Sequence, residues 1–189
     1  MTRLLFIVTE DRWFVTHRLH LAKAAIANKY RVAVLCRITK YRDVIQDSGV
    51  EVIEWVLDRG SINPFTELLA VKRIYHALQH FKPDLVHAVA IKPVLYSAVS
   101  CCLAGTQART FALGGLGFVF SSKRLKARLL RLILVPSLRW ALSGRRSCLI
   151  LQNPDDCSTL VSLKIINSDR VHIIRGAGVD TESDILPRK

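Results

Sequence analysis

A short segment near the N-terminus carries side chains suited to binding a sugar. It combines two acids, Glu10 and Asp11, with two aromatic residues, Trp13 and Phe14, and with His17. Carboxylates accept hydrogen bonds from hydroxyl groups, and an aromatic ring offers a flat apolar face on which a sugar ring can stack. An acidic helix cap with Trp13 as a core residue accounts for the same pattern equally well, so this segment alone leaves both interpretations open.

Two more polar residues, His87 and Lys92, lie at the end of an apolar run. They place an imidazole and an ammonium group between a predicted strand end and a predicted helix start. A single histidine in such a position is more often a hydrogen-bonded structural residue than a catalyst. Both residues are nevertheless candidates for the floor of a ligand site.

Two glycine-rich turns follow later apolar runs. The first contains Gly114, Gly115 and Gly117, and the second contains Arg175 and Gly176. Glycine lets the backbone approach a ligand closely, and an arginine beside bare backbone can bind a phosphate. The first turn lacks the spacing and position of a dinucleotide fingerprint, so it is a weak nucleotide signal. The second is also explained as an ordinary turn.

Other catalytic patterns find little support in the sequence. His76 and His80 have the i, i+4 spacing of a metal pair, but no acid or cysteine is placed to complete a site. We therefore expect a solvated helix face there and no metal. Because no G-x-S-x-G or P-loop motif occurs, hydrolase and nucleoside triphosphatase functions are unsupported.

Seven short apolar runs, rich in Val, Ile and Leu, predict the strands that must position these residues. Their continuity, without polar alternation, is typical of strands buried on both faces of a parallel sheet. The runs cover residues 4–8, 32–36, 50–56, 85–90, 109–113, 148–151 and 171–174.

Helices are predicted between the strands. Asn63 is an N-cap, Pro64 a first-turn proline and Glu67 a first-turn acid, and Pro83 ends this helix. Strands that alternate with helices imply a Rossmann-like, doubly wound, mostly parallel sheet flanked by helices. Ligands bind at the carboxyl ends of the strands in such sheets. Further helices are expected from residue 16 to 29, from 93 to 105 and from 153 onwards.

Length and composition limit the class of protein. The 189 residues are half hydrophobic, and 28 Lys and Arg against 15 Asp and Glu give a formal charge of +13. One folded domain fits this length, and the charge favours anionic partners. Five cysteines without C-x-x-C spacing predict reduced thiols and a cytosolic compartment. No apolar run is long enough to cross a bilayer or resembles an export signal.

A basic segment, residues 123–146, contains eight Lys and Arg and no acid. Taken as a helix, it brings Arg124, Arg128, Arg131 and Arg139 onto one arc, with leucines and Trp140 around the rest. This pattern suits the interface of an anionic membrane. A surface helix that packs its apolar side on the sheet is equally consistent. Nucleic acid is not an expected partner, because no zinc-finger, RRM or KH motif is present.

Six ordered motifs give the chain a family resemblance. They resemble the N-terminal domain of family-four glycosyltransferases of the GT-B fold, most of all bacterial enzymes that build capsule, O-antigen or glycoprotein glycans on a polyprenyl-diphosphate carrier. The resemblance covers residues 1 to about 180 and does not identify the sugar. The motifs are TEDRWFVTHRLHLAKAA, DRGSINPFTELLA, PDLVHAVAIKPVLY, LGGLGFVF, LQNPDD and IIRGAGVD.

The resemblance implies that a glycosyl group passes from a sugar nucleotide, bound as substrate, to an acceptor hydroxyl. It implies a cleft between two Rossmann-like domains, with no metal or other cofactor. By position, Glu10, Asp11 and His17 would line the acceptor side, and His87 and Lys92 would form the cleft floor. Asp11, His17 and His87 are the candidates for catalysis.

The glycine turns gain roles from the same resemblance. Gly114, Gly115 and Gly117 would form a close-approach loop on the acceptor side. Arg175 and Gly176 would lie near the donor diphosphate, whose charge cationic side chains and helix dipoles offset.

Members of this family continue into a C-terminal domain that holds most of the donor site, whereas this chain ends nine residues after Asp180. We therefore expect residues 1–180 to form the acceptor-side domain and 181–189 to begin an interdomain linker. The donor domain would be a separate polypeptide, lost by truncation, or outside a fragment. The expected protein is a cytoplasmic half-enzyme, peripheral on the inner membrane and inactive without its donor domain. The alternative is a non-catalytic module that binds an anionic membrane or a protein partner.

Overall fold

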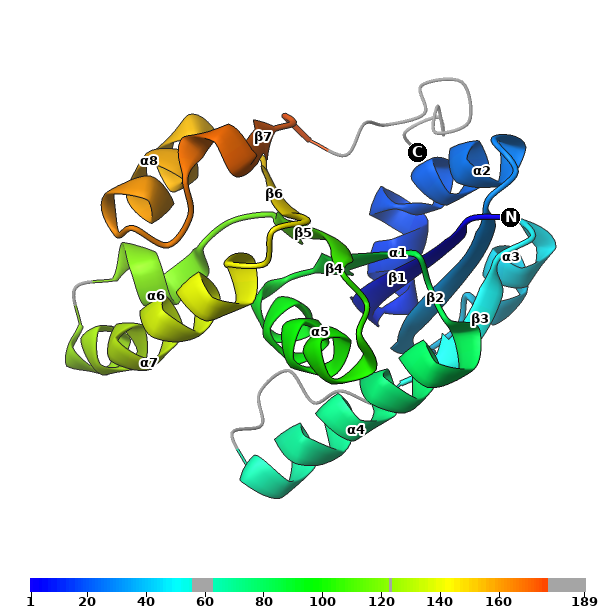
Figure 1. Ribbon diagram of the computed structural model, residues 1–189, viewed down its shortest axis with the longest axis horizontal. Helices are drawn as coiled ribbons and strands as arrows, with labels where there is room; N and C mark the ends of the chain where they lie inside the picture. Colours follow the sequence, from blue (N-terminus) through cyan, green and yellow to red (C-terminus); the bar gives the residue numbers. More distant parts are fainter. Residues whose placement is uncertain (56–62, 123, 177–189) are drawn as a thin grey trace, which may run out of the picture.

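The computed structural model describes residues 1–55, 63–122 and 124–176, and they form one seven-stranded sheet between two layers of helices (Figure 1). The strand order is β3-β2-β1-β4-β5-β6-β7, and every pair of neighbours is parallel. The strands are β1 (Arg3–Glu10), β2 (Arg31–Arg37), β3 (Glu51–Glu54), β4 (Leu85–Val89), β5 (Ala108–Leu113), β6 (Ser147–Leu151) and β7 (Val171–Ile173).

All seven predicted strands are confirmed, and so is the Rossmann-like, doubly wound class. Alternate residues of β1 show why the apolar runs are continuous. Leu5 and Ile7 belong to one buried cluster, whereas Leu4 and Phe6 belong to a second cluster on the other face. Because side chains alternate between faces of a strand, a strand buried on both sides needs apolar residues at every position.

Each face of the sheet is covered by its own helices. The second cluster, with Phe14, Ala22 and Ile45, packs α1 to α3 on one face, and the first cluster packs α4, α5, α7 and α8 on the sheet. The helices are α1 (Asp11–His17), α2 (Leu19–Ala27), α3 (Arg42–Asp47), α4 (Pro64–Phe81), α5 (Ile91–Ala104), α6 (Gly117–Ser121), α7 (Leu125–Leu142) and α8 (Pro154–Ser162), with a 3-10 turn η1 at Ser168–Arg170.

Two helices start where their capping residues predict. The Asn63 side chain accepts a hydrogen bond from the backbone N–H of Phe65, and the Asn153 side chain accepts one from that of Asp156. Each helix has a proline in its first turn, where the missing N–H costs nothing.

The prediction for residues 9–18 was wrong in one respect. We expected a helix only from about residue 16, but helix α1 begins directly at Asp11, and the helical path is interrupted at Arg18 before α2. Asp11 is an acid in the first turn, which the helix dipole favours. Its carboxylate also accepts hydrogen bonds from residues 39–41, the segment that leads into α3. These bonds hold the start of α1 in place.

The basic segment forms one helix, α7, that continues through Pro136. Figure 1 places it at the far end of the molecule from α2 and α3. No helix among residues 1–55, 63–122 and 124–176 is long and apolar enough to span a membrane.

Candidate functional site

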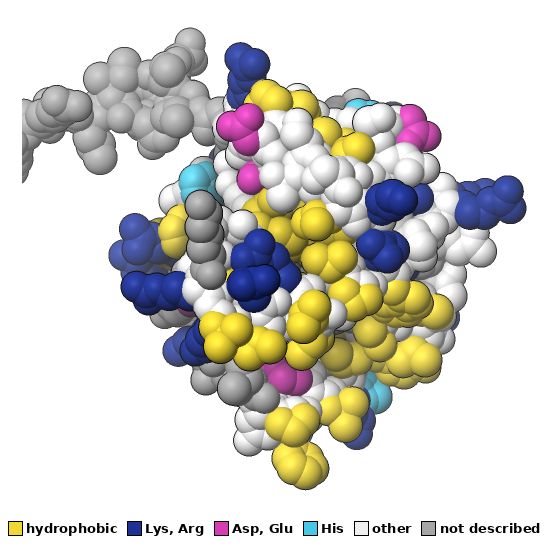
Figure 2. All heavy atoms as spheres, turned by 90° about the vertical axis from the view of Figure 1, so that its left-hand side faces the viewer, with side chains coloured by type: hydrophobic (Ala, Val, Ile, Leu, Met, Phe, Trp, Pro, Cys, Tyr) yellow, Lys and Arg dark blue, Asp and Glu magenta, His cyan; other side chains and the backbone are white. Residues whose placement is uncertain are grey.

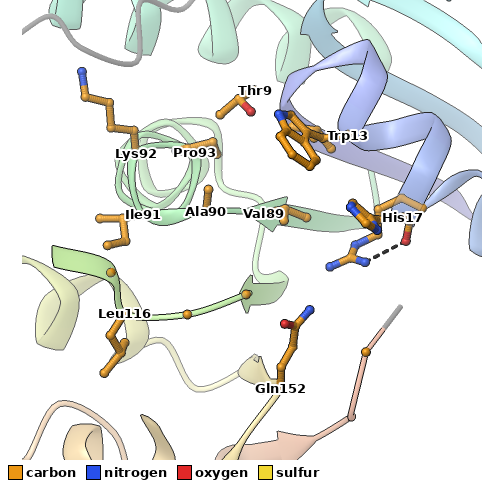
Figure 3. A pocket seen from close by; sticks show the side chains of 16 residues that line it. Thr9, Trp13, His17, Val89, Ala90, Ile91, Lys92, Pro93, Leu116 and Gln152 are labelled. Carbon is orange, nitrogen blue, oxygen red and sulfur yellow. Dashed lines mark hydrogen bonds between the residues drawn. The ribbon is translucent and has the colours of Figure 1, made fainter. Parts of the chain in front are cut away.

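A hollow lies at the carboxyl edge of the sheet. We call it the large chamber; its volume is about 800 Å³. Its lining comes from the segments that follow β1, β4, β5, β6 and β7, as parallel strands require. The lining residues are Val8, Thr9, Trp13, His17, Arg18, Val89, Ala90, Ile91, Lys92, Pro93, Gly114, Gly115, Leu116, Gly117, Gln152 and Gly176 (Figure 3).

A second hollow of about 170 Å³, the small chamber, adjoins the first. Both chambers are lined by the same five residues, His17, Arg18, Gly114, Gln152 and Gly176, so they are parts of one cleft. No Asp or Glu occurs in the lining that the structure describes. The small chamber adds His20, Leu21, His87, Ala112, Leu113, Ile150 and Ile174.

The start of α5 gives the large chamber a positive pole. This helix has no side-chain cap, and its first residues, Ile91 and Lys92, line the chamber. The N-terminal N–H groups of a helix favour anions. The residue before the helix, Ala90, has φ +83°. A non-glycine residue held there costs about 1–3 kcal/mol, and such strain is common at functional sites.

Two of the N-terminal candidates do lie at the cleft. Trp13 and His17 both line the large chamber, and their rings stack with centroids 5.6 Å apart and planes at 11°. Trp13 is 40% exposed, so it is not a core residue. In Figure 3 its indole is directed into the space between Thr9 and Val89. The core interpretation of Trp13 is therefore wrong, and its role in stacking on a sugar stays a prediction.

Asp11 is fully buried and lines neither chamber. Its carboxylate accepts hydrogen bonds from the backbone N–H groups of Arg12, Thr39, Lys40 and Tyr41 and from the Thr39 hydroxyl, all at 2.7–2.9 Å. Burial raises its pKa, but the hydrogen bonds from Thr39, Tyr41 and Lys40 together outweigh burial and lower the pKa to about 2. These bonds give Asp11 a structural task, and its acceptor-binding and catalytic roles stay predictions.

Glu10 and Lys92 occupy different parts of the cleft region. Glu10 ends β1 and is outside the lining of both chambers. Lys92 lines the large chamber, yet its ammonium forms an ion pair with Glu67 of α4 at 3.0 Å. Figure 3 shows the ammonium directed away from the centre of the chamber. Lys92 therefore joins α4 to the start of α5 and offers its alkyl stem to the chamber.

His87 lies at the base of the small chamber and is only 5% exposed. Its ring packs edge-on against Phe6 at 5.3 Å, and its buried Nε2 has no hydrogen-bond partner. Burial, with a further contribution from the Arg18 charge, lowers the pKa of His87 to about 3. The imidazole is thus neutral at pH 7, and a buried polar atom without a partner points to a missing ligand or water.

The predicted glycine turns also meet at the cleft. Gly114 lines both chambers, and Gly115 and Gly117 line the large one. A Cβ on Gly115 would meet nothing within 4 Å, so open space lies beside its backbone. Gly176 lines both chambers, whereas Arg175 is exposed and outside the lining.

The basic residues of α7 lie elsewhere. Arg124, Arg128 and Trp140 are exposed, with their neighbours in the sequence mostly exposed as well. Arg131 donates to the Ser122 carbonyl and Arg139 to two carbonyls after α8. Arg131 and Arg139 therefore hold backbone segments of the described chain, whereas Arg124 and Arg128 are exposed side chains.

The cleft residues that sequence reasoning missed include Thr9, Arg18, Ala90 and Gln152. Thr9 and Gln152 lie at or just past the ends of apolar runs, and that position was a usable signal. The importance of Arg18 depends on the break between α1 and α2, which no motif marks. The strained backbone of Ala90 has no signature in the residue type.

Domains of this fold occur in solved structures of larger proteins. An Anabaena protein, HepE, crystallised with UDP and glucose, aligns with 93% of this chain at 14% identity and a TM-score of 0.63. Acinetobacter baumannii MurG aligns with 96% at 12% identity and a TM-score of 0.57. This chain covers 45% and 47% of those proteins. At such identities the likeness establishes the fold alone, a Rossmann-like half of the GT-B type.

The sequence decides the family. The model of the glycosyl transferase 4-like family matches residues 3–153, so the chain belongs to that family. A curated relative from Campylobacter jejuni is 26% identical over 117 residues, which is 62% of this chain. It is the N,N'-diacetylbacillosaminyl-diphospho-undecaprenol alpha-1,3-N-acetylgalactosaminyltransferase, and this chain matches 31% of its length. The family resemblance drawn from the six motifs is confirmed.

The carboxylate of Asp11 makes the stability of the protein depend on pH. Its pKa is depressed on folding from 3.8 to about 2. The stabilisation is therefore present above pH 3.8 and is lost as the pH falls towards 2. We expect Asp11→Asn to lower the free energy of unfolding at pH 7 by about 2 kcal/mol. This is the typical contribution of hydrogen bonds to a charged group, which the uncharged amide loses.

Urea unfolding of both proteins between pH 7 and pH 3 measures this difference, which should shrink at the acid end. The exposed Asp47→Asn is the matched control and should have little effect at any pH. Equal stability of wild type and Asp11→Asn at pH 7 would contradict the assigned hydrogen bonds.

Proposed function

We propose that this chain is the acceptor-side half of a glycosyltransferase that moves a sugar from a sugar nucleotide to a glycan on a polyprenyl diphosphate. Membership of the glycosyl transferase 4-like family over residues 3–153 carries the proposal. The name of the C. jejuni relative, which specifies a diphospho-undecaprenol substrate, supports the lipid-linked acceptor. The cleft adds chemical support, because its described lining holds cationic and imidazole groups and no acid.

Different parts of the cleft suit the sugar and the phosphate groups of the proposed substrates. The exposed face of Trp13 beside His17 suits a sugar ring. The open backbone at Gly115 and the N-terminus of α5 suit an anionic group. His87, with a buried Nε2 that lacks a partner, is the candidate of this cleft for contact with a reacting hydroxyl or phosphate oxygen. His17 is the exposed alternative.

The proposed reaction needs a second domain to hold the donor. The chain spans less than half the length of the HepE and MurG structures and 31% of the curated relative. Transfer requires both reactants to be oriented in one site that excludes water. We therefore expect this chain alone to bind acceptor and to turn over slowly or not at all. Arg175, exposed at the end of the described chain, is the residue proposed to face the donor diphosphate.

A radiolabel assay tests the proposal. Purified chain is mixed with a panel of UDP-sugars and undecaprenyl-diphosphate-linked acceptors, with and without the separately expressed C-terminal domain of the C. jejuni relative. We expect transfer only in the mixture, and a loss of about tenfold to a hundredfold in His87→Gln, the loss typical of a hydrogen bond to a charged group.

His76→Gln, on the exposed face of α4, is the matched control and should keep full activity. Transfer by the chain alone would overturn the need for a second domain. Unchanged transfer by His87→Gln would remove that residue from the mechanism.

A second function, docking on an anionic membrane, rests on α7. An ordinary surface helix buries its apolar side, but here Leu125, Leu129, Leu132 and Ile133 are 55–73% exposed. Figure 2 faces this side of the molecule and shows hydrophobic side chains gathered together with Lys and Arg beside them. A helix that exposes leucines among basic residues suits a membrane interface. Phe65 and Leu68 of α4 and Leu103 of α5 are further exposed apolar residues.

This arrangement would fix the protein on the inner face of the cytoplasmic membrane, where a lipid-linked acceptor lies. A non-catalytic module would dock in the same way, because binding to a membrane does not require glycosyl transfer. The two functions are separable by experiment.

Liposome co-sedimentation measures the docking. Arg124→Glu/Arg128→Glu, which leaves the hydrogen-bonded Arg131 and Arg139 intact, should weaken binding to phosphatidylglycerol vesicles by about thirtyfold or more, at about 1 kcal/mol per basic residue. Lys23→Glu/Lys29→Glu changes the same charge at the opposite end of the molecule, within α2 and just after it, and should bind much more like wild type. Equal losses in both pairs would contradict docking through α7.

A further inference from the structure

Arg18 holds a position in the cleft that the proposed function does not yet use. It lies at the break between α1 and α2, with φ −135° and ψ −15°, where the chain leaves the helical path. From there its side chain lines both the large and the small chamber. The interruption between the two helices therefore places Arg18 in the region that the two chambers share.

The guanidinium is poorly satisfied by the protein. One of its terminal nitrogens, Nη1, donates to the carbonyl of the adjacent His17 at 2.7 Å, the bond drawn as a dashed line in Figure 3. Its Nε is buried and has no hydrogen-bond partner. The three ion pairs of the described chain involve Arg31, Arg42 and Lys92, so no carboxylate of that part neutralises Arg18.

Without a ligand, this arrangement of Arg18 lowers the stability of the folded chain. Burial lowers the pKa of Arg18 from its ordinary value, but arginine keeps its proton in proteins. A partly buried cation without a counter-ion, and with an unmade hydrogen bond, destabilises the folded chain. An anion that supplies both the charge and an acceptor atom would remove this cost.

His87 provides the second, independent sign of a ligand. It is 5% exposed, its Nε2 has no hydrogen-bond partner, and the residue lines the small chamber that Arg18 also lines. A neutral imidazole can donate from Nε2. The small chamber is therefore lined by two residues, Arg18 and His87, that each have a buried nitrogen without a hydrogen-bond partner, and its described lining contains no acid.

We propose that Arg18 is the anion-binding residue of the small chamber and holds phosphoryl oxygens of a diphosphate substrate, with His87 as the second donor. The inference rests on the proposed transfer function and deepens it by naming a residue that positions the substrate. A guanidinium matches phosphate oxygens with paired donors, and the glycine backbone at Gly114 and Gly176 leaves room for the group. The diphosphate belongs either to the sugar nucleotide or to the lipid-linked acceptor.

Isothermal titration calorimetry of the full chain tests the proposal, with pyrophosphate as the first probe. We expect wild type to bind pyrophosphate and Arg18→Gln to bind it about tenfold to a hundredfold more weakly, the loss typical of a charged hydrogen-bond pair. Arg18→Lys should recover part of the affinity, because it restores charge without the fork. Arg73→Gln, at an exposed position of α4 outside the lining of both chambers, is the matched control and should bind like wild type.

Two further probes identify the source of the diphosphate. A dependence on Arg18 for UDP but not for farnesyl diphosphate assigns the chamber to the donor, and the reverse assigns it to the acceptor; either result supports the proposal. A loss of wild-type folding in Arg18→Gln would be seen by circular dichroism. In that case the ¹⁵N resonance of Arg18 Nε in the wild-type chain decides, since it should shift when pyrophosphate is added.

The proposal is overturned if wild type does not bind pyrophosphate, if Arg18→Gln binds as tightly as wild type, or if the Nε resonance does not move. Failure of the transfer assay with pyrophosphate binding still dependent on Arg18 would instead count against the proposed function. The two failures are therefore distinguishable.

Discussion

The direction of the strands is the constraint on which the cleft depends. Because all seven strands run parallel, each chain segment that leaves a strand emerges at the same edge of the sheet. Residues separated by more than 160 positions, such as Trp13 and Gly176, therefore line one hollow. A single reversed strand would send its loop to the opposite edge and remove its residues from the site.

Electrostatics then determines what this edge can hold. Two acids on elements that border the cleft are already engaged: Asp11 accepts hydrogen bonds from the segment before α3, and Glu67 pairs with Lys92. The described lining is left with Arg18, histidines, glycine backbone and the start of α5. These groups attract anions, and the proposed substrates carry diphosphates. The cleft also adjoins the apolar helix α7 through the short α6, which contacts α7 and begins at Gly117. If α7 lies on a membrane, the large chamber opens near the lipid surface.

Much of this organisation was predictable from the sequence, for identifiable reasons. Continuous apolar runs fix buried parallel strands because both faces must exclude water, and Asn63 and Asn153 mark helix starts because their side chains cap free N–H groups. The residues after the strands could therefore be placed at one edge before any coordinates were known. The partners of Asp11 could not, because they lie 28 to 30 positions away and depend on how α1 meets α3. The position of Arg18 in the cleft could not be predicted for a related reason. The interruption between α1 and α2 sets the direction of its side chain, and no pattern in the neighbouring sequence marks that interruption.

Hydrogen–deuterium exchange of the full chain, with and without farnesyl diphosphate or UDP, tests the central claim most directly. The account predicts that a bound diphosphate slows exchange in the segments that follow the strands, around residues 12–18, 90–95 and 113–117. It predicts no change at the opposite edge, around residues 28–31 and 143–147. Protection confined to that opposite edge, or no protection at any segment with saturating ligand, would contradict a binding cleft at the carboxyl ends of the strands.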